Sequence, residues 1–116
     1  MSNNNDDTED VFVYMGEGSI VPDDVVRIRI HSSVSIIPRR VFSKCKSLKQ
    51  IHLPSSITMI QMGAFFGCNL EDVELCQGLI EIGIVAFSGC LKLKHIHLPS
   101  TVKKIGECHT CRECCI

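Results

Sequence analysis

The sequence predicts a solenoid in which about three and a half short coils stack along one axis, with a parallel sheet on one face. The first observation is a register of isoleucines spaced 23, 22 and 23 residues apart, at Ile37, Ile60, Ile82 and Ile105. The second is that each of the first three is followed five residues later by a phenylalanine and eight residues later by a cysteine. A fixed period of this length is typical of coils that bury their apolar faces only against their neighbours.

Eight columns of apolar residues result when the coils are aligned on this register. Of the 32 aligned positions, 29 are apolar, although only 45% of the chain is hydrophobic. The three polar exceptions all lie in the last coil, at His109, Thr110 and Glu113. We therefore expect equivalent side chains to lie directly above one another, including one continuous pile of phenylalanines at Phe42, Phe65 and Phe87.

Composition divides the chain into four predicted segments. Residues 1–10 are rich in acidic residues and asparagine, so we expect a disordered head. Residues 11–24 are expected to form an N-terminal edge strand and loop, and residues 25–107 the solenoid. Residues 108–116 are a Cys-rich C-terminal tail in which the repeat pattern is lost.

The coil at residues 48–68 illustrates how each unit is predicted to fold. Apolar and polar residues alternate over its first part, which predicts a strand with one buried and one exposed face. Pro54 ends this strand because proline lacks the N–H that a continuing ladder needs. Residues 57–60 are expected to form a second short extended segment. Residues 63–68 are expected to close the coil as a short helical turn, and three buried, reduced cysteines to line the core.

These residues resemble the BspA-like class of leucine-rich repeats, whose pattern runs I-G-x-x-A-F-x-x-C-x-x-L-x-x-I-x-L-P. The segment that matches it position by position is Ile82-Gly83-Ile84-Val85-Ala86-Phe87-Ser88-Gly89-Cys90, followed by Leu93, Ile96, Leu98 and Pro99. The resemblance covers about Val25 to Gly106. It implies a leucine-rich-repeat solenoid, α/β or mostly β, of right-handed coils of 22–23 residues. It also implies a binding role without chemistry of its own.

Two departures from the family pattern stand out. The stretch from Cys68 to Leu70 is one residue short. The last coil replaces the expected Ala-Phe-x-x-Cys with a run of cysteines and polar residues after Gly106. A fragment of a longer array, with no role alone, is therefore one alternative for this chain, and end-to-end self-association is then expected.

The outward positions of the predicted parallel strands form the candidate binding face. They make two columns: Arg27, Gln50, Asp72 and His95, and Arg29, His52, Glu74 and His97. Adjacent strands lie about 4.8 Å apart, so neighbouring side chains in a column touch and present alternating charge to a partner. We expect a protein partner here, although a half-exposed sheet would be polar on this face without any partner.

A second alternative is zinc binding or thiol redox chemistry in the tail, at Cys108, Cys111 and Cys114, because cysteines at this spacing can face one centre. No metal site is predicted at the strand face, where stacking would place ligands in a row rather than around a tetrahedron. No cofactor is expected either.

Several function classes are not expected from the sequence. It offers no nucleophile and base at a plausible spacing and no glycine-rich phosphate loop, so enzyme activity is not predicted. A net charge of −1, 5% aromatic content and no tryptophan disfavour nucleic-acid binding. With no signal-like segment and no run of about 20 apolar residues, we expect no membrane span and a cytoplasmic location.

Overall fold

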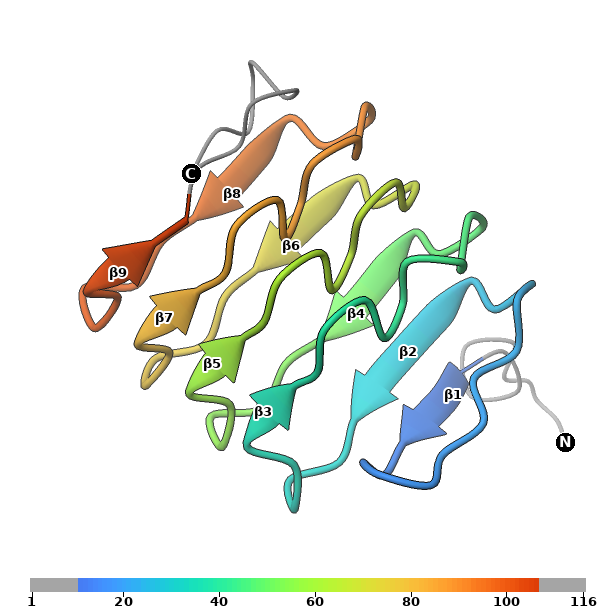
Figure 1. Ribbon diagram of the computed structural model, residues 1–116, viewed down its shortest axis with the longest axis horizontal. Helices are drawn as coiled ribbons and strands as arrows, with labels where there is room; N and C mark the ends of the chain where they lie inside the picture. Colours follow the sequence, from blue (N-terminus) through green and yellow to red (C-terminus); the bar gives the residue numbers. More distant parts are fainter. Residues whose placement is uncertain (1–10, 107–116) are drawn as a thin grey trace, which may run out of the picture.

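The computed structural model describes residues 11–106 of the 116, apart from the side chain of His95. The described chain winds into a solenoid of stacked coils built from short parallel strands (Figure 1). These strands are β1 (Val11–Tyr14), β2 (Arg27–Ile30), β3 (Ile36–Ile37), β4 (Gln50–His52), β5 (Met59–Ile60), β6 (Asp72–Glu74), β7 (Glu81–Ile82), β8 (His95–His97) and β9 (Lys104–Ile105). The predicted fold class is confirmed.

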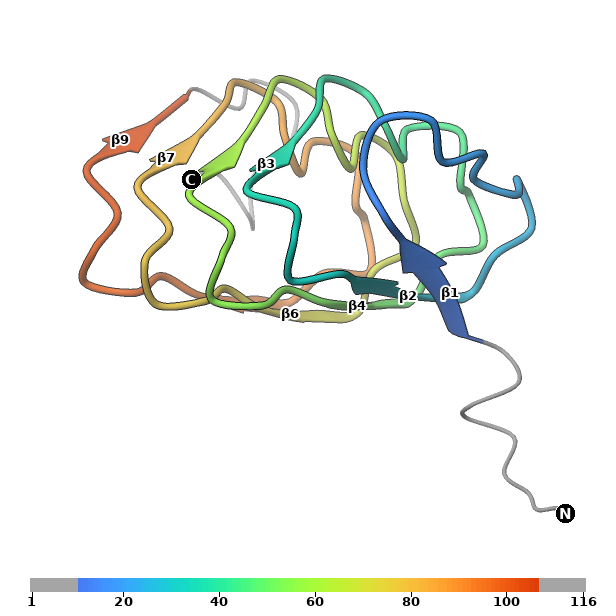
Figure 2. The same ribbon diagram turned by 90° about the horizontal axis from the view of Figure 1, so that it is seen from below.

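The strands form two opposite sides of the solenoid (Figure 2). One side carries the longer strands, in the orders β1-β2-β4 and β6-β8, and the other carries the two-residue strands in the order β3-β5-β7-β9. On this second side Ile37 pairs with Ile60, Ile60 with Ile82, and Ile82 with Ile105. The predicted register is therefore the actual one, because residues of one column are neighbours across the ladder.

A continuous aromatic stack runs through the core. The ring centroids of Phe42 and Phe65 lie 5.4 Å apart and those of Phe65 and Phe87 lie 5.2 Å apart, both pairs in stacked geometry. Tyr14 covers the N-terminal end of the stack, with its ring edge against Phe42 at 5.3 Å. All four rings are buried. The expectation of one pile of phenylalanines is confirmed.

Three cysteines form a second buried column beside the aromatic stack. The Cys68 thiol donates to the Phe42 carbonyl at 3.2 Å, and the Cys90 thiol donates to the Phe65 carbonyl at 3.1 Å. Together with Cys45 they are free thiols and almost fully buried. Burial raises the pKa of Cys68 to about 12, so this thiol is protonated at neutral pH. The cysteines thus act as small core residues whose hydrogen bonds join successive coils.

The closing segments are turns and not the short helical turns that the sequence predicted; residues 11–106 contain no helix. Their backbone donors bond to the next coil, as in Phe42 N–H to the Ala64 carbonyl and Phe65 N–H to the Ala86 carbonyl, both at 2.9 Å. A donor used between coils is not available for bonds within a helix. Position 63 and its equivalents also have positive φ, which a right-handed helix does not permit. No stretch of residues 11–106 therefore forms a helix that could cross a bilayer.

Candidate functional site

The predicted binding residues lie on the side of the solenoid that carries the longer strands. They occupy β2, β4, β6 and β8, two per strand, on either side of one inward-facing apolar residue. The ladder places them opposite one another in the pairs Arg27↔Gln50, Arg29↔His52, Asp72↔His95 and Glu74↔His97. Successive side chains of a strand point to opposite faces, so the two polar residues of each strand face outward and the apolar residue between them faces the core.

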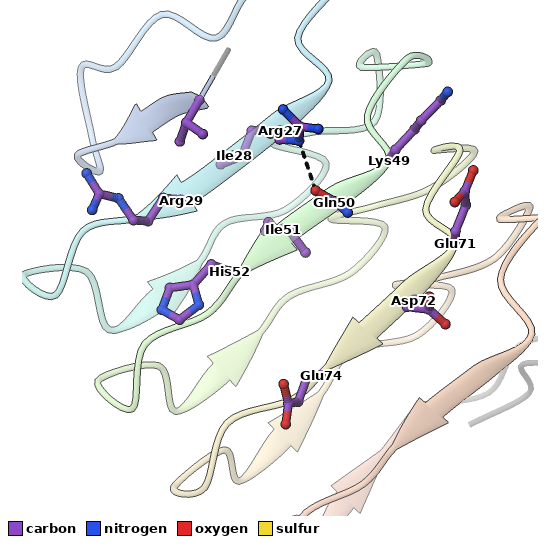
Figure 3. A pocket seen from close by; sticks show the side chains of 11 residues that line it. Arg27, Ile28, Arg29, Lys49, Gln50, Ile51, His52, Glu71, Asp72 and Glu74 are labelled. Carbon is purple, nitrogen blue, oxygen red and sulfur yellow. Dashed lines mark hydrogen bonds between the residues drawn. The ribbon is translucent and has the colours of Figure 1, made fainter. Parts of the chain in front are cut away.

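The structure brings six of these eight residues together around one hollow of about 400 Å³ (Figure 3). The six are Arg27, Arg29, Gln50, His52, Asp72 and Glu74. His97 is exposed on β8, outside this set. Apolar side chains of β2 and β4, Ile28 and Ile51, also line the hollow. The site thus offers a small apolar surface surrounded by polar and charged groups.

Opposite charges face each other across the hollow. Arg27 and Arg29 lie on β2, whereas Asp72 and Glu74 lie on β6, with β4 between them (Figure 3). We call these pairs the basic wall and the acidic wall. One hydrogen bond ties the basic wall to β4, from Arg27 Nε–H to Gln50 Oε1 at 2.9 Å.

No salt bridge crosses between the two walls within residues 11–106. The ion pairs there join Lys44 to Asp23 at 3.8 Å and Lys104 to Glu81 at 3.7 Å, and none of these four residues lines the hollow. Arg29 and Glu74 are both exposed, so their charges face solvent. A partner that carries both signs of charge could pair with both walls.

Two charged residues of the hollow were missed in the sequence analysis. Lys49 and Glu71 directly precede β4 and β6, and both line the hollow beside the predicted residues. A strand prediction that assigns outward positions only within the strand leaves these residues out. The signal that could have found them is their common place in the repeat, just after the buried leucine that follows each cysteine.

The alternative site at Cys108, Cys111 and Cys114 lies outside the described residues. Among the side chains that the structure describes, which do not include His95, no group of three or more histidines, cysteines, aspartates or glutamates could hold a metal ion. The described cysteines also form no disulfide. The zinc or redox alternative for the tail therefore stays a prediction.

Comparison with known proteins identifies the repeat. A sequence model described as "BspA type Leucine rich repeat region (6 copies)" matches residues 23–116. The chain is a BspA-type leucine-rich repeat protein. This confirms the family that the motif around Ile82–Cys90 indicated. No curated protein matches the sequence of this BspA-type protein.

Solved structures of bacterial leucine-rich repeat proteins are similar to it. A leucine-rich repeat protein from T. pallidum is 36% identical, with a TM-score of 0.69 over 71% of this chain and 39% of that one. One from Bacteroides ovatus is 31% identical, with a TM-score of 0.68 over 72% of this chain and 21% of that one. A leucine-rich cell surface protein from Faecalibacterium prausnitzii is 32% identical, with a TM-score of 0.62 over 64% of this chain and 20% of that one. This BspA-type chain thus spans less than half the length of each neighbour.

Proposed function

We propose that this BspA-type repeat protein is a non-catalytic module that binds a protein partner through its strand face. The observation that carries the proposal is the hollow of about 400 Å³ over β2, β4 and β6, with opposite charges on its two walls. Charges arranged in this way steer association and select between partners. The strands hold these side chains on a rigid support, which reduces the entropy lost on binding.

The chemistry of the face favours recognition over catalysis. Its charged side chains are mostly exposed, whereas acid–base catalysis uses groups with shifted pKa values in enclosed surroundings. Ile51 adds an apolar contact of the kind found at the centre of protein interfaces, with charged groups around it. A nucleic acid is a poor fit for this face because the acidic wall would repel its phosphates.

The test compares two double variants that remove the same charges from opposite sides of the solenoid. Arg29→Ala with Glu74→Ala alters the hollow, whereas Lys104→Ala with Glu81→Ala removes one cation and one anion from β9 and β7. Each variant is immobilised beside the wild type, and proteins captured from a lysate of the source cells are compared by quantitative mass spectrometry.

We expect one protein to be captured by the wild type and by the β7–β9 variant, and at least tenfold less of it by the hollow variant. Equal capture by all three proteins would contradict the proposal. Matching thermal unfolding curves for the two variants exclude loss of the fold as the cause of a difference.

Self-association of the C-terminal end of the described chain stays a proposal with its own support. Leu98 and Ile105 are 41% and 40% exposed, whereas Leu75 and Ile82, their equivalents one coil earlier, are 5% and 1% exposed. Exposed apolar side chains of this kind favour association. Sedimentation velocity over a range of concentrations tests it: a sedimentation coefficient that stays constant would contradict self-association.

The expected cytoplasmic location also stays a proposal. One of the similar structures is described as a cell surface protein, so the test compares the cytoplasm with the cell surface. Fractionation of the source cells, with detection by an antibody against the purified chain, separates the two. Signal confined to the soluble cytoplasmic fraction would support the cytoplasmic location, and signal at the cell surface would contradict it.

A further inference from the structure

The hollow lies beside a coil whose connection into the strand face is shorter than in the other described coils that carry the buried cysteine. In two coils the buried leucine is the third residue after the cysteine, as in Cys45 and Leu48 and in Cys90 and Leu93. The leucine N–H donates to the cysteine carbonyl in both coils, at 3.1 and 3.0 Å. These bonds close a two-residue turn. In the coil between them, Leu70 is the second residue after Cys68, and the chain continues there without the turn.

The ladder of the strand face is interrupted at the same coil. β2 pairs with β4, and β6 pairs with β8, but β4 and β6 belong to different sheets. The Glu71 N–H donates to the Lys49 carbonyl at 3.3 Å just before the two strands, and the ladder does not continue beyond it. A turn shortened by one residue explains the break, since β6 enters the face without the offset that the other coils provide.

This break exposes a residue that the repeat would otherwise bury. Ile28 and Val73 are 2% and 3% exposed, whereas Ile51 and Ile96 in the same column are half-buried. Ile96 lies on β8, the last strand of its sheet, whereas Ile51 lies in the middle of the strand face, beside the break, and lines the hollow. Ile51 belongs to β4, the strand whose pairing toward β6 is lost. The interruption therefore gives the strand face an apolar contact point that a continuous sheet would cover.

A second hollow on the far side of the shortened connection points to the same cause. It has a volume of about 450 Å³ and is lined by Glu71, Asp72, Leu91, Lys92 and Lys94. Leu91 lies in the two-residue turn of the next coil and is 86% exposed. The turn that would stand in front of Leu91 is the one missing after Cys68, so the missing residue also leaves space beside Leu91, although β6 and β8 stay paired.

We infer that the residue missing after Cys68 creates the binding site, and that its occupant is an extended segment of a partner protein with an apolar side chain between an acidic and a basic one. The apolar side chain contacts Ile51, the acidic one faces the basic wall and the basic one faces the acidic wall. This inference rests on the proposed function and names the partner's chemistry.

The dimensions of an extended chain agree with this occupant. β2 and β6 lie on either side of β4, and two spacings of a regular sheet would place them about 10 Å apart, which is a lower bound across the break. Side chains at alternate positions of an extended segment lie about 7 Å apart on one face, so three of them cover roughly 13 Å. A segment that crosses the strands can therefore place its middle side chain over β4 and its two charged side chains at the walls.

The decisive experiment restores the missing residue. Inserting a serine between Asn69 and Leu70 copies the spacing of Cys45-Lys46-Ser47-Leu48 while keeping all eight predicted binding residues. The substitution Asn69→Ser, without an insertion, is the matched control. The probes are four acetylated and amidated pentapeptides: Glu-Ser-Val-Ser-Lys, its reverse, Glu-Ser-Val-Ser-Glu and Lys-Ser-Val-Ser-Lys. Binding is measured by NMR titration of the labelled protein.

We expect at least one mixed-charge peptide to bind the wild type and the Asn69→Ser variant, shifting amide signals of residues 49–52 and 71–74. Both single-sign peptides should bind the wild type at least tenfold more weakly, and the insertion should weaken the mixed-charge peptide at least tenfold. Equal binding by the insertion variant, equal binding of a single-sign peptide, or no binding of any peptide would overturn the inference.

A second variant keeps the test decisive if the insertion prevents folding. Arg29→Glu leaves the gap in place and makes the basic wall less basic, so the preference should move from the mixed-charge peptides to the lysine peptide. An unchanged preference would overturn the inference. If a partner captured through Arg29 and Glu74 binds the insertion variant as well as the wild type, the proposed function stands and this inference fails.

Discussion

The interior of this solenoid and its strand face follow the repeat to different degrees. Inside, the same residue types recur from coil to coil, as in the stack of Phe42, Phe65 and Phe87. On the face, the equivalent outward position carries Arg29, then His52, then Glu74. The repeat therefore specifies how the coils stack, and the departures from it create the differences in charge and shape that a partner can recognise.

The largest expected effect comes from breaking the interior. Phe65→Ala removes the middle ring of the stack, where it contacts a ring on either side at 5.4 and 5.2 Å and is fully buried. We expect the free energy of unfolding to fall by about 3–5 kcal/mol, measured by urea denaturation.

The adjacent Phe66 provides the matched control. Its side chain is 39% exposed, so Phe66→Ala should cost no more than about 1 kcal/mol. The binding-face variant Arg29→Ala should stay within about 0.5 kcal/mol of the wild type, since its side chain is exposed. A Phe65→Ala variant as stable as the Phe66→Ala variant would show that the stack does not hold the coils together.

A smaller effect is expected at a backbone position whose geometry repeats although its residue type does not. Arg40, Gly63 and Val85 have φ values of 54°, 64° and 48° at equivalent places in three coils. Left-handed geometry costs roughly 1–2 kcal/mol for a residue with a side chain, and β-branched residues tolerate it least. Gly63→Val should therefore lower the free energy of unfolding by about 2 kcal/mol.

The reverse substitution at the equivalent position sharpens this prediction. Val85→Gly relieves the same strain but makes the unfolded chain more flexible, which offsets part of the gain. We expect the free energy of unfolding to stay unchanged or rise by up to about 1 kcal/mol. Urea denaturation of both variants checks the pair, and equal destabilisation by the two substitutions would contradict a backbone origin.

The smallest effect concerns the buried thiols and appears only at alkaline pH. Burial raises the pKa of Cys68 from 9.0 to about 12. Between these values the unfolded chain releases the proton and the folded chain keeps it, so stability falls as the pH rises above about 9. Below that range the thiol is protonated in both states and contributes no pH dependence.

This titration can be separated from other alkaline effects with one variant. The stability advantage of the wild type over Cys68→Ala should shrink by about 1 kcal/mol between pH 8 and pH 10. Denaturation at both pH values in the presence of a reductant measures it. A difference that stays constant with pH would mean that the Cys68 thiol is not shielded from solvent in the folded protein.

Much of the fold was predictable because every coil of a stacked array has nearly the same local structure. The spacing of Ile37, Ile60 and Ile82 fixed the register, and the alternation of each strand identified six residues that line the hollow. The closing turns were predicted wrongly as helical turns. A small residue and a glycine suit a helix end and an inter-coil turn equally well, and only the neighbouring coil decides where their N–H groups bond.

By itself, the sequence determined the stacking axis, the buried columns and the candidate binding residues, because these follow from period and alternation alone. The tertiary structure decided which of the outward residues share a hollow and which apolar residue becomes accessible within it. The missing position after Cys68 is visible in the sequence, but its consequence depends on how β6 meets β4. Hydrogen bonds between strands form only at the right separation and register, so an altered connection appears as a break in the ladder only when the coils are placed side by side.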